Sequence, residues 1–111
     1  MIPKPVLGLF RGNVATISAP TKGEVTSSSI AVTGSVVWYK GGEWGVAYKK
    51  HSASSWTHKS STSQTIDETL TSLTASTQYD IKLYVKYQDV YQYGPVLEVT
   101  TEAAPAETPG T

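Results

Sequence analysis

The residues of this sequence that are best suited to binding chemistry are aromatic, and they fall in two predicted loops. One loop carries Trp38 and Tyr39, and the other carries Tyr87, Tyr91 and Tyr93. Flat amphipathic rings stack on apolar surfaces, still offer a polar edge, and supply contact area at low entropic cost. These five residues are our candidate recognition surface, for a protein partner or a surface glycan. The alternative is that two or three of them cap the end of a hydrophobic core.

Catalytic and metal-binding chemistry lack the residues that they need. His51 and His58 stand seven positions apart, which places them on opposite faces of a strand and roughly 20 Å apart if the chain is extended. Asp67 and Glu68 are adjacent, so on a strand they cannot flank one glycosidic bond. The serines occur without a nucleophile elbow or a His–Asp pair, and Gly41-Gly42 lacks the Lys-Ser/Thr of a phosphate cradle. We therefore expect a non-enzymatic protein with no catalytic residue, cofactor or bound metal.

Charge and composition exclude further classes of partner. The 111 residues carry nine basic and nine acidic side chains without a basic cluster, so we expect neither nucleic acid nor an anionic membrane surface as a ligand. No apolar run approaches the ~20 residues of a spanning helix, and two early prolines disfavour a signal peptide. Because cysteine is absent, disulfides cannot contribute and packing alone must hold the fold.

The element that reveals the fold is an alternating strand that begins at Tyr79. Apolar residues recur at every second position from Tyr79 to Val85, whereas Asp80 and Lys82 lie in the opposite phase, which is the pattern of a strand with one buried face. Tyr79 also follows Leu73 by six residues. This spacing suits a tyrosine corner, in which the buried ring's hydroxyl bonds to backbone a few residues upstream, and it predicts a β-sandwich.

The remaining chain predicts seven strands in one domain, with turn signals at short intervals. The expected strands are 22–26, 29–36, 43–49, 56–59, 64–70, 79–86 and 96–101, with 87–94 as a loop. We expect an N-terminal extended arm at 1–19, the sandwich at 20–102 and a flexible Pro/Ala/Thr tail at 103–111. The predicted core is Ile30, Val32, Val36, Val46, Tyr48, Ile66, Leu70, Leu73, Tyr79, Ile81, Leu83, Val85, Leu97 and Val99.

Residues 20–102 resemble a fibronectin type III domain, in the divergent form of Bacteroidetes surface proteins and phage structural proteins. The resemblance is carried by 30–36, 44–48, 70–79 and Tyr93-Gly94 before 99–101. The sequence departs from the family at two places: Gly34 or a neighbouring residue stands where the family usually has a tryptophan, and Ala75 stands where the family commonly has a proline in the corner. The resemblance implies an all-β, seven-stranded immunoglobulin-like sandwich.

Two non-enzymatic functions follow as expectations. The first is a virion-associated structural protein, such as a capsid decoration or tail protein, docked on a capsid or other structural subunit by an apolar arm with Leu7, Leu9 and Phe10. The alternative is a spacer or carbohydrate-binding accessory domain of a secreted bacterial surface protein, supported by the tail and the loop aromatics. The expected location is accordingly a virion surface, a cell surface or the extracellular space.

Overall fold

The computed structural model describes residues 15–38 and 40–104, and these form nine strands and no helix. The strands are β1 (Thr16–Ile17), β2 (Thr21–Val25), β3 (Ile30–Val37), β4 (Glu43–Lys50), β5 (Thr57–Ser60), β6 (Thr65–Leu70), β7 (Gln78–Tyr87), β8 (Val90–Tyr93) and β9 (Leu97–Thr100). Within these residues, nothing helical is long and apolar enough to cross a membrane.

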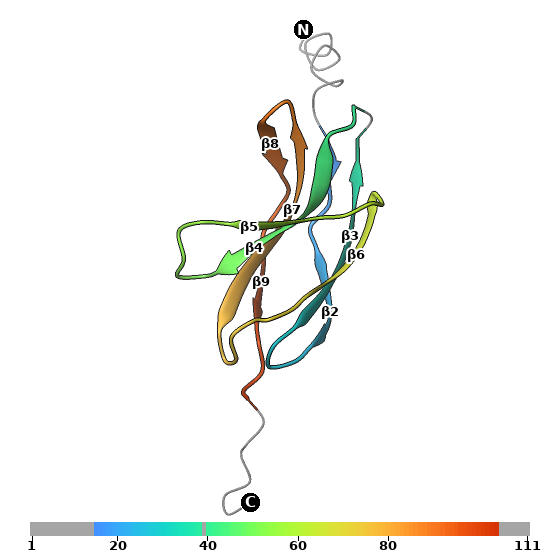
Figure 1. Ribbon diagram of the computed structural model, residues 1–111. Helices are drawn as coiled ribbons and strands as arrows, with labels where there is room; N and C mark the ends of the chain where they lie inside the picture. The colour runs from blue at the N-terminus through green and yellow to red at the C-terminus, as the bar shows by residue number, and fades with distance from the viewer. Residues whose placement is uncertain (1–14, 39, 105–111) are drawn as a thin grey trace, which may run out of the picture.

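Two antiparallel sheets face each other as a sandwich (Figure 1). In one sheet, β3 lies between β6 and the pair β1 and β2; in the other, β4 pairs with β5 and β7, and β7 also pairs with β8 and β9. The β4–β5 hairpin projects sideways from the sandwich (Figure 1). The predicted all-β sandwich is confirmed.

The structure has nine strands where seven were predicted, because β1 lies in the predicted arm and β8 in the predicted loop. β1 and β2 pair with the same strand, β3, and are separated by a segment that ends at the buried Pro20. β8 and β9 likewise both pair with β7, and Gly94-Pro95 separates them. Proline cannot donate a ladder hydrogen bond, so it tends to stand where an edge strand breaks.

Alternation along the strands places the core between the sheets. Four residues of β7 in one phase, Tyr79, Ile81, Leu83 and Val85, are each at most 4% exposed. The other predicted core residues are also buried, except Tyr48, Leu73 and Leu97, which are partly buried and pack against the cluster. Gly34 belongs to this layer because a Cβ at that position would lie 2.6 Å from Cδ1 of Leu83.

The tyrosine corner forms as predicted. The Tyr79 hydroxyl accepts a hydrogen bond of 2.9 Å from the backbone N–H of Thr74, five residues upstream. The ring itself is 4% exposed, and Leu73 packs against the same core. The corner therefore ties the segment between β6 and β7 to the sandwich interior.

The predicted loop at 87–94 is wrong, because β8 occupies half of it. Gln88 and Asp89 have φ values of 51° and 66°, so both lie in the left-handed region. Two consecutive residues of this kind form the tight turn that matches the twist of a two-stranded hairpin. The β7–β8 connection is thus a two-residue turn, and the aromatic residues after it lie on a strand.

The last part of the expected arm belongs to the sandwich. Thr16 and Ile17 pair with Val37 and Val36 of β3. The Ala15 N–H donates a hydrogen bond of 2.8 Å to Oε1 of Gln92, which belongs to the other sheet. Residues 1–14 and 105–111 lie outside the described residues. They include Leu7, Leu9 and Phe10, so the docking arm stays a prediction, as does most of the tail.

Candidate recognition surface

The four predicted recognition residues that the structure describes do not form one surface. Trp38 is 3% exposed and belongs to the core, where its indole N–H donates to the carbonyl oxygen of Gly41 at 2.6 Å. Tyr87, half-buried, meets the Trp38 ring edge-on at 5.6 Å between centroids. The prediction that Trp38 is exposed is therefore wrong, because its ring closes the end of the core. Tyr39 lies outside the described residues.

Tyr91 and Tyr93 face the other way because residues of β8 alternate between the two faces of its sheet. Both are on the outer face, and their exposed fractions are 38% and 40%. Their rings are parallel to within 2°, with centroids 5.6 Å apart, so they stack along the strand. Val90, which precedes Tyr91, and Gln92, which lies between the two tyrosines, line a hollow of about 290 Å³ beside Trp38.

Tyr84 forms the base on which these rings rest. It pairs with Tyr93 in the β7–β8 ladder and lies on the outer face of the sheet, yet it is 0% exposed. The Tyr91 and His58 rings lie 5.9 and 4.8 Å from the Tyr84 ring and cover it. The Tyr84 hydroxyl donates to Oε2 of Glu43, and burial together with this carboxylate raises the pKa of Tyr84 far above its ordinary value.

Small residues in β4 allow close approach by the backbone of β5, the strand that carries His58. Gly45 is the partner of Tyr84 in the β4–β7 ladder, and Ala47 is the partner of His58 in the β4–β5 ladder. Both are buried, and a Cβ at Gly45 would lie 2.1 Å from the carbonyl oxygen of Lys59. The outer face of the sheet therefore carries a small aromatic cluster of its own, separate from the main core.

Lysine ammonium groups complete the cluster. The Nζ atom of Lys82 lies over two rings, 3.9 Å from the centroid of Trp56 and 3.6 Å from that of Tyr93. The Nζ atom of Lys86 lies 5.4 Å from the Tyr91 centroid. Burial, with a smaller contribution from the neighbouring positive charge of Lys49, lowers the pKa of Lys82. We call the set Trp56, His58, Lys82, Lys86, Tyr91 and Tyr93 the aromatic face.

His58 of β5 connects the β5 side of the aromatic face with the tyrosines of β8. Its Nε2 atom and the hydroxyl of Tyr93 lie 3.1 Å apart, within hydrogen-bond distance. Burial is the largest influence on the pKa of His58 and lowers it; Lys82 and Lys86 act in the same direction, whereas Glu43 opposes them. The lowered pKa favours the neutral ring, and a neutral imidazole can accept a hydrogen bond from the Tyr93 hydroxyl.

A cluster of charged side chains lies near the other end of the same sheet. Asp80, 8% exposed, accepts hydrogen bonds from Nζ of Lys49 at 3.2 Å and from Nδ1 of His51 at 2.9 Å. Burial alone would raise the pKa of Asp80, but the bonds from His51 and Lys49 outweigh it and hold the pKa below its ordinary value. Glu98 of β9 joins Asp80 and His51, with one ligand atom of each within 4.8 Å of the others.

This trio is the arrangement among the described residues whose ligand types and spacing could suit a metal ion. The Lys49 ammonium already binds the Asp80 carboxylate, and a cation there would have to displace it. The geometry is that of an ion-pair network, with Asp80 as the shared acceptor of a lysine and a histidine.

Sequence reasoning missed Trp56, His58 and Lys82 as members of a binding surface. Two signals were available in the sequence. Lys82, Tyr84 and Lys86 occupy alternate positions of β7 and so share one face of the strand, and the spacing of Tyr91 and Tyr93 places both rings on one side of β8. That β5 lies beside them across β4 is a property of the pairing order, which the sequence pattern did not show.

Comparison with known proteins places the fold. No family model and no curated protein matches the chain. Among solved structures, a fibronectin type III domain of human fibronectin type III domain containing protein 3 matches with a TM-score of 0.65 at 15% identity, covering 86% of this chain and 92% of that one. The fibronectin type III domain derived from human KIAA0970 protein matches with a TM-score of 0.64 at 13% identity, covering 99% and 90%.

A third similar structure is the sensor domain of the anti-sigma factor RsgI4 in Pseudobacteroides cellulosolvens, with a TM-score of 0.62 at 18% identity over 86% of this chain and 80% of that one. Identities this low show the fold alone. Together with the two-sheet topology and the tyrosine corner, they show that this chain has a fibronectin type III-like fold.

Proposed function

We propose that the chain is a non-enzymatic recognition module whose aromatic face binds a protein partner. Its support begins with the fold, because fibronectin type III-like domains are typically non-catalytic modules that often mediate protein interactions. The observation that carries the proposal is the exposed pair Tyr91 and Tyr93, held in a fixed orientation by stacking and by the buried Tyr84 beneath. Preorganised tyrosines lose little entropy when they bind.

The chemistry of the face favours a protein over a glycan. Sugar recognition by an aromatic residue uses the ring face, but Lys82 already covers the face of Tyr93, and Tyr91 stacks on the same ring. What the surface offers instead is the ring edges of Tyr91 and Tyr93 and the Lys86 ammonium. Tyrosine is enriched at protein interfaces, where a few residues dominate the binding energy.

The test compares capture by four forms of the domain. Wild type, Trp56→Ala/Tyr91→Ala, Tyr91→Phe and Val37→Ala are immobilised and exposed to the proteins of the source cells and of any host. Val37 is the matched control, because it is 46% exposed on the opposite sheet. Circular dichroism and thermal unfolding first confirm that each variant is folded.

We expect a protein that wild type, Tyr91→Phe and Val37→Ala retain and that the double variant loses. Calorimetry with that protein should show a loss of at least about 30-fold in affinity for the double variant, corresponding to about 2 kcal/mol for a dominant contact. Equal capture by all four forms, or a glycan that binds wild type but not the double variant, would contradict the proposal.

The finer role expected from the sequence stays a proposal. A virion-associated protein would dock by its N-terminal segment, whose apolar residues Leu7, Leu9 and Phe10 support that role. The alternative, a spacer or carbohydrate-binding accessory domain of a secreted surface protein, draws on the Pro/Ala/Thr tail. Imaging the chain in its native assembly separates the two, because only the first expects it on a virion.

A further inference from the structure

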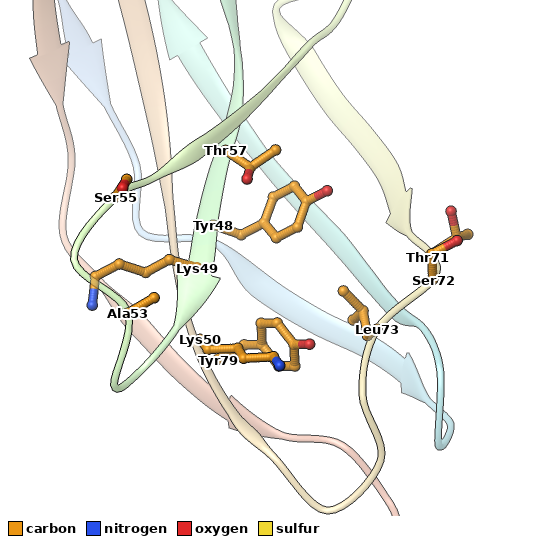
Figure 2. A pocket seen from close by; sticks show the side chains of 10 residues that line it. All are labelled: Tyr48, Lys49, Lys50, Ala53, Ser55, Thr57, Thr71, Ser72, Leu73 and Tyr79. Atoms are coloured by element: carbon orange, nitrogen blue, oxygen red, sulfur yellow. The ribbon is translucent and has the colours of Figure 1, made fainter.

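A second concave site lies at the open edge of the sandwich, away from the aromatic face. It is a hollow of about 300 Å³ between the end of β4, the β4–β5 hairpin and the segment Thr71 to Leu73 that precedes the tyrosine corner. Figure 2 shows the Tyr48 side chain extending from β4 toward that segment. Tyr48 and Lys50 occupy the phase of β4 opposite to Gly45 and Ala47, so they point away from the aromatic face.

The lining is rich in hydroxyl groups without an internal partner. Tyr48, Ser55, Thr57, Thr71 and Ser72 all border the hollow, and among the described residues none of their hydroxyls makes a hydrogen bond within the chain. Apolar surface comes from the half-buried Leu73 and the Tyr48 ring. A small polar ligand could therefore find several donors and acceptors around one flat apolar wall.

The charge of the lining is positive. Its two lysines are Lys49 and Lys50, and none of its ten residues is acidic. Lys49 is neutralised by Asp80 at 3.2 Å, whereas Lys50 has no ion-pair partner among the described residues. An anionic group on the ligand would find that ammonium at the rim of the hollow.

From this lining we infer a binding site for a carboxylate-bearing sugar unit, a hexuronic acid of a polysaccharide. A volume of about 300 Å³ stands at the lower end of ligand pockets, which span roughly 300–1,000 Å³, so it suits one sugar ring better than a larger ligand. Sugar hydroxyls match the unpartnered hydroxyls of Thr57, Thr71 and Ser72, the apolar ring face can pack on Tyr48, and the carboxylate pairs with Lys50. This site is separate from the aromatic face, and either can exist without the other.

The experiment titrates the whole chain with a trimer of galacturonic acid while backbone amide signals are followed by NMR. The methyl-esterified trimer is the matched ligand, because it keeps the sugar rings and loses the negative charge. Acetate tests for a response to any anion. The protein variants are Lys50→Gln and Tyr48→Ala, with Lys22→Gln, an exposed lysine of β2, as the control.

We expect shifts at Lys50, Thr57 and Ser72 with the acidic trimer, at least tenfold weaker binding of the methyl ester, and no saturable response to acetate. Lys50→Gln should weaken the acidic trimer about tenfold and remove the preference over the ester, whereas Lys22→Gln should bind as wild type does. Tyr48→Ala should weaken both trimers. The inference is overturned by absent shifts at millimolar ligand, by equal binding of acetate, by equal binding of the two trimers, or by shifts confined to the aromatic face.

Discussion

Replacing Tyr79 by phenylalanine tests the tyrosine corner by removing one oxygen atom. The ring stays in the core, so the apolar area that it buries is unchanged, but the N–H of Thr74 loses the acceptor that lies at 2.9 Å. A buried donor left without a partner costs about 1–3 kcal/mol. Because this bond is only partly buried, water can reach the N–H, and we expect a loss of about 1–2 kcal/mol in the free energy of unfolding.

Thermal and urea unfolding give the measurement. An unfolding entropy of about 2.1 cal/mol/K per residue implies that the melting temperature falls by about 4–8 °C for this loss. The midpoint in urea should fall while the slope stays constant, because the surface exposed on unfolding is the same.

Tyr48→Phe is the control for this experiment. It makes the same chemical change at a half-buried tyrosine whose hydroxyl makes no hydrogen bond among the described residues. We expect it to change the free energy of unfolding by less than about 0.5 kcal/mol. Equal effects of the two substitutions would refute the argument that the Tyr79 hydroxyl stabilises the fold through Thr74.

Three further predictions follow from the core, the charged cluster and the meeting of the first and last strands. Leu83→Ala, at a fully buried site, should lower the free energy of unfolding by about 2–5 kcal/mol in urea. The pKa of Asp80 is lower in the folded state, so its carboxylate stabilises the fold above the unfolded pKa of about 3.9, and this contribution is lost as the pH falls through the folded pKa. Urea unfolding across pH should therefore show that Asp80→Asn is less stable than wild type at pH 7 and that the difference shrinks below about pH 4. A difference that stays constant with pH would contradict this prediction. Gly94→Ala would place a Cβ 2.6 Å from Cγ2 of Ile17 and 3.0 Å from its carbonyl oxygen, so we expect a loss of about 1–3 kcal/mol and faster hydrogen exchange of the Ile17 amide than in wild type.

The aromatic face shows how far strand phase alone can reach. The alternation of 79–86 correctly separated the buried phase from the one with Lys82, yet Tyr84, in the outer phase, is fully buried. A second layer covers it because β5 and β8 bring His58 and Tyr91 to the same face from sequence distances of 26 and 7 residues. The alternation of a strand determines on which side of the sheet a side chain lies, but whether that side chain is buried depends on the neighbouring strands.

The sequence by itself determined the fold class, most of the core and the tyrosine corner, because these depend on local periodicity and on one short spacing, from Leu73 to Tyr79. Tertiary structure decided what that periodicity does not encode. Trp38 enters the core because the end of the sandwich leaves room for its ring and offers the Gly41 carbonyl to its N–H. The hollow beside Tyr48 brings Thr57 of β5 together with the segment Thr71 to Leu73, which follows β6 of the other sheet. Contacts between segments remote in sequence follow from strand order, and a single strand's pattern carries no information about which strand lies next to it.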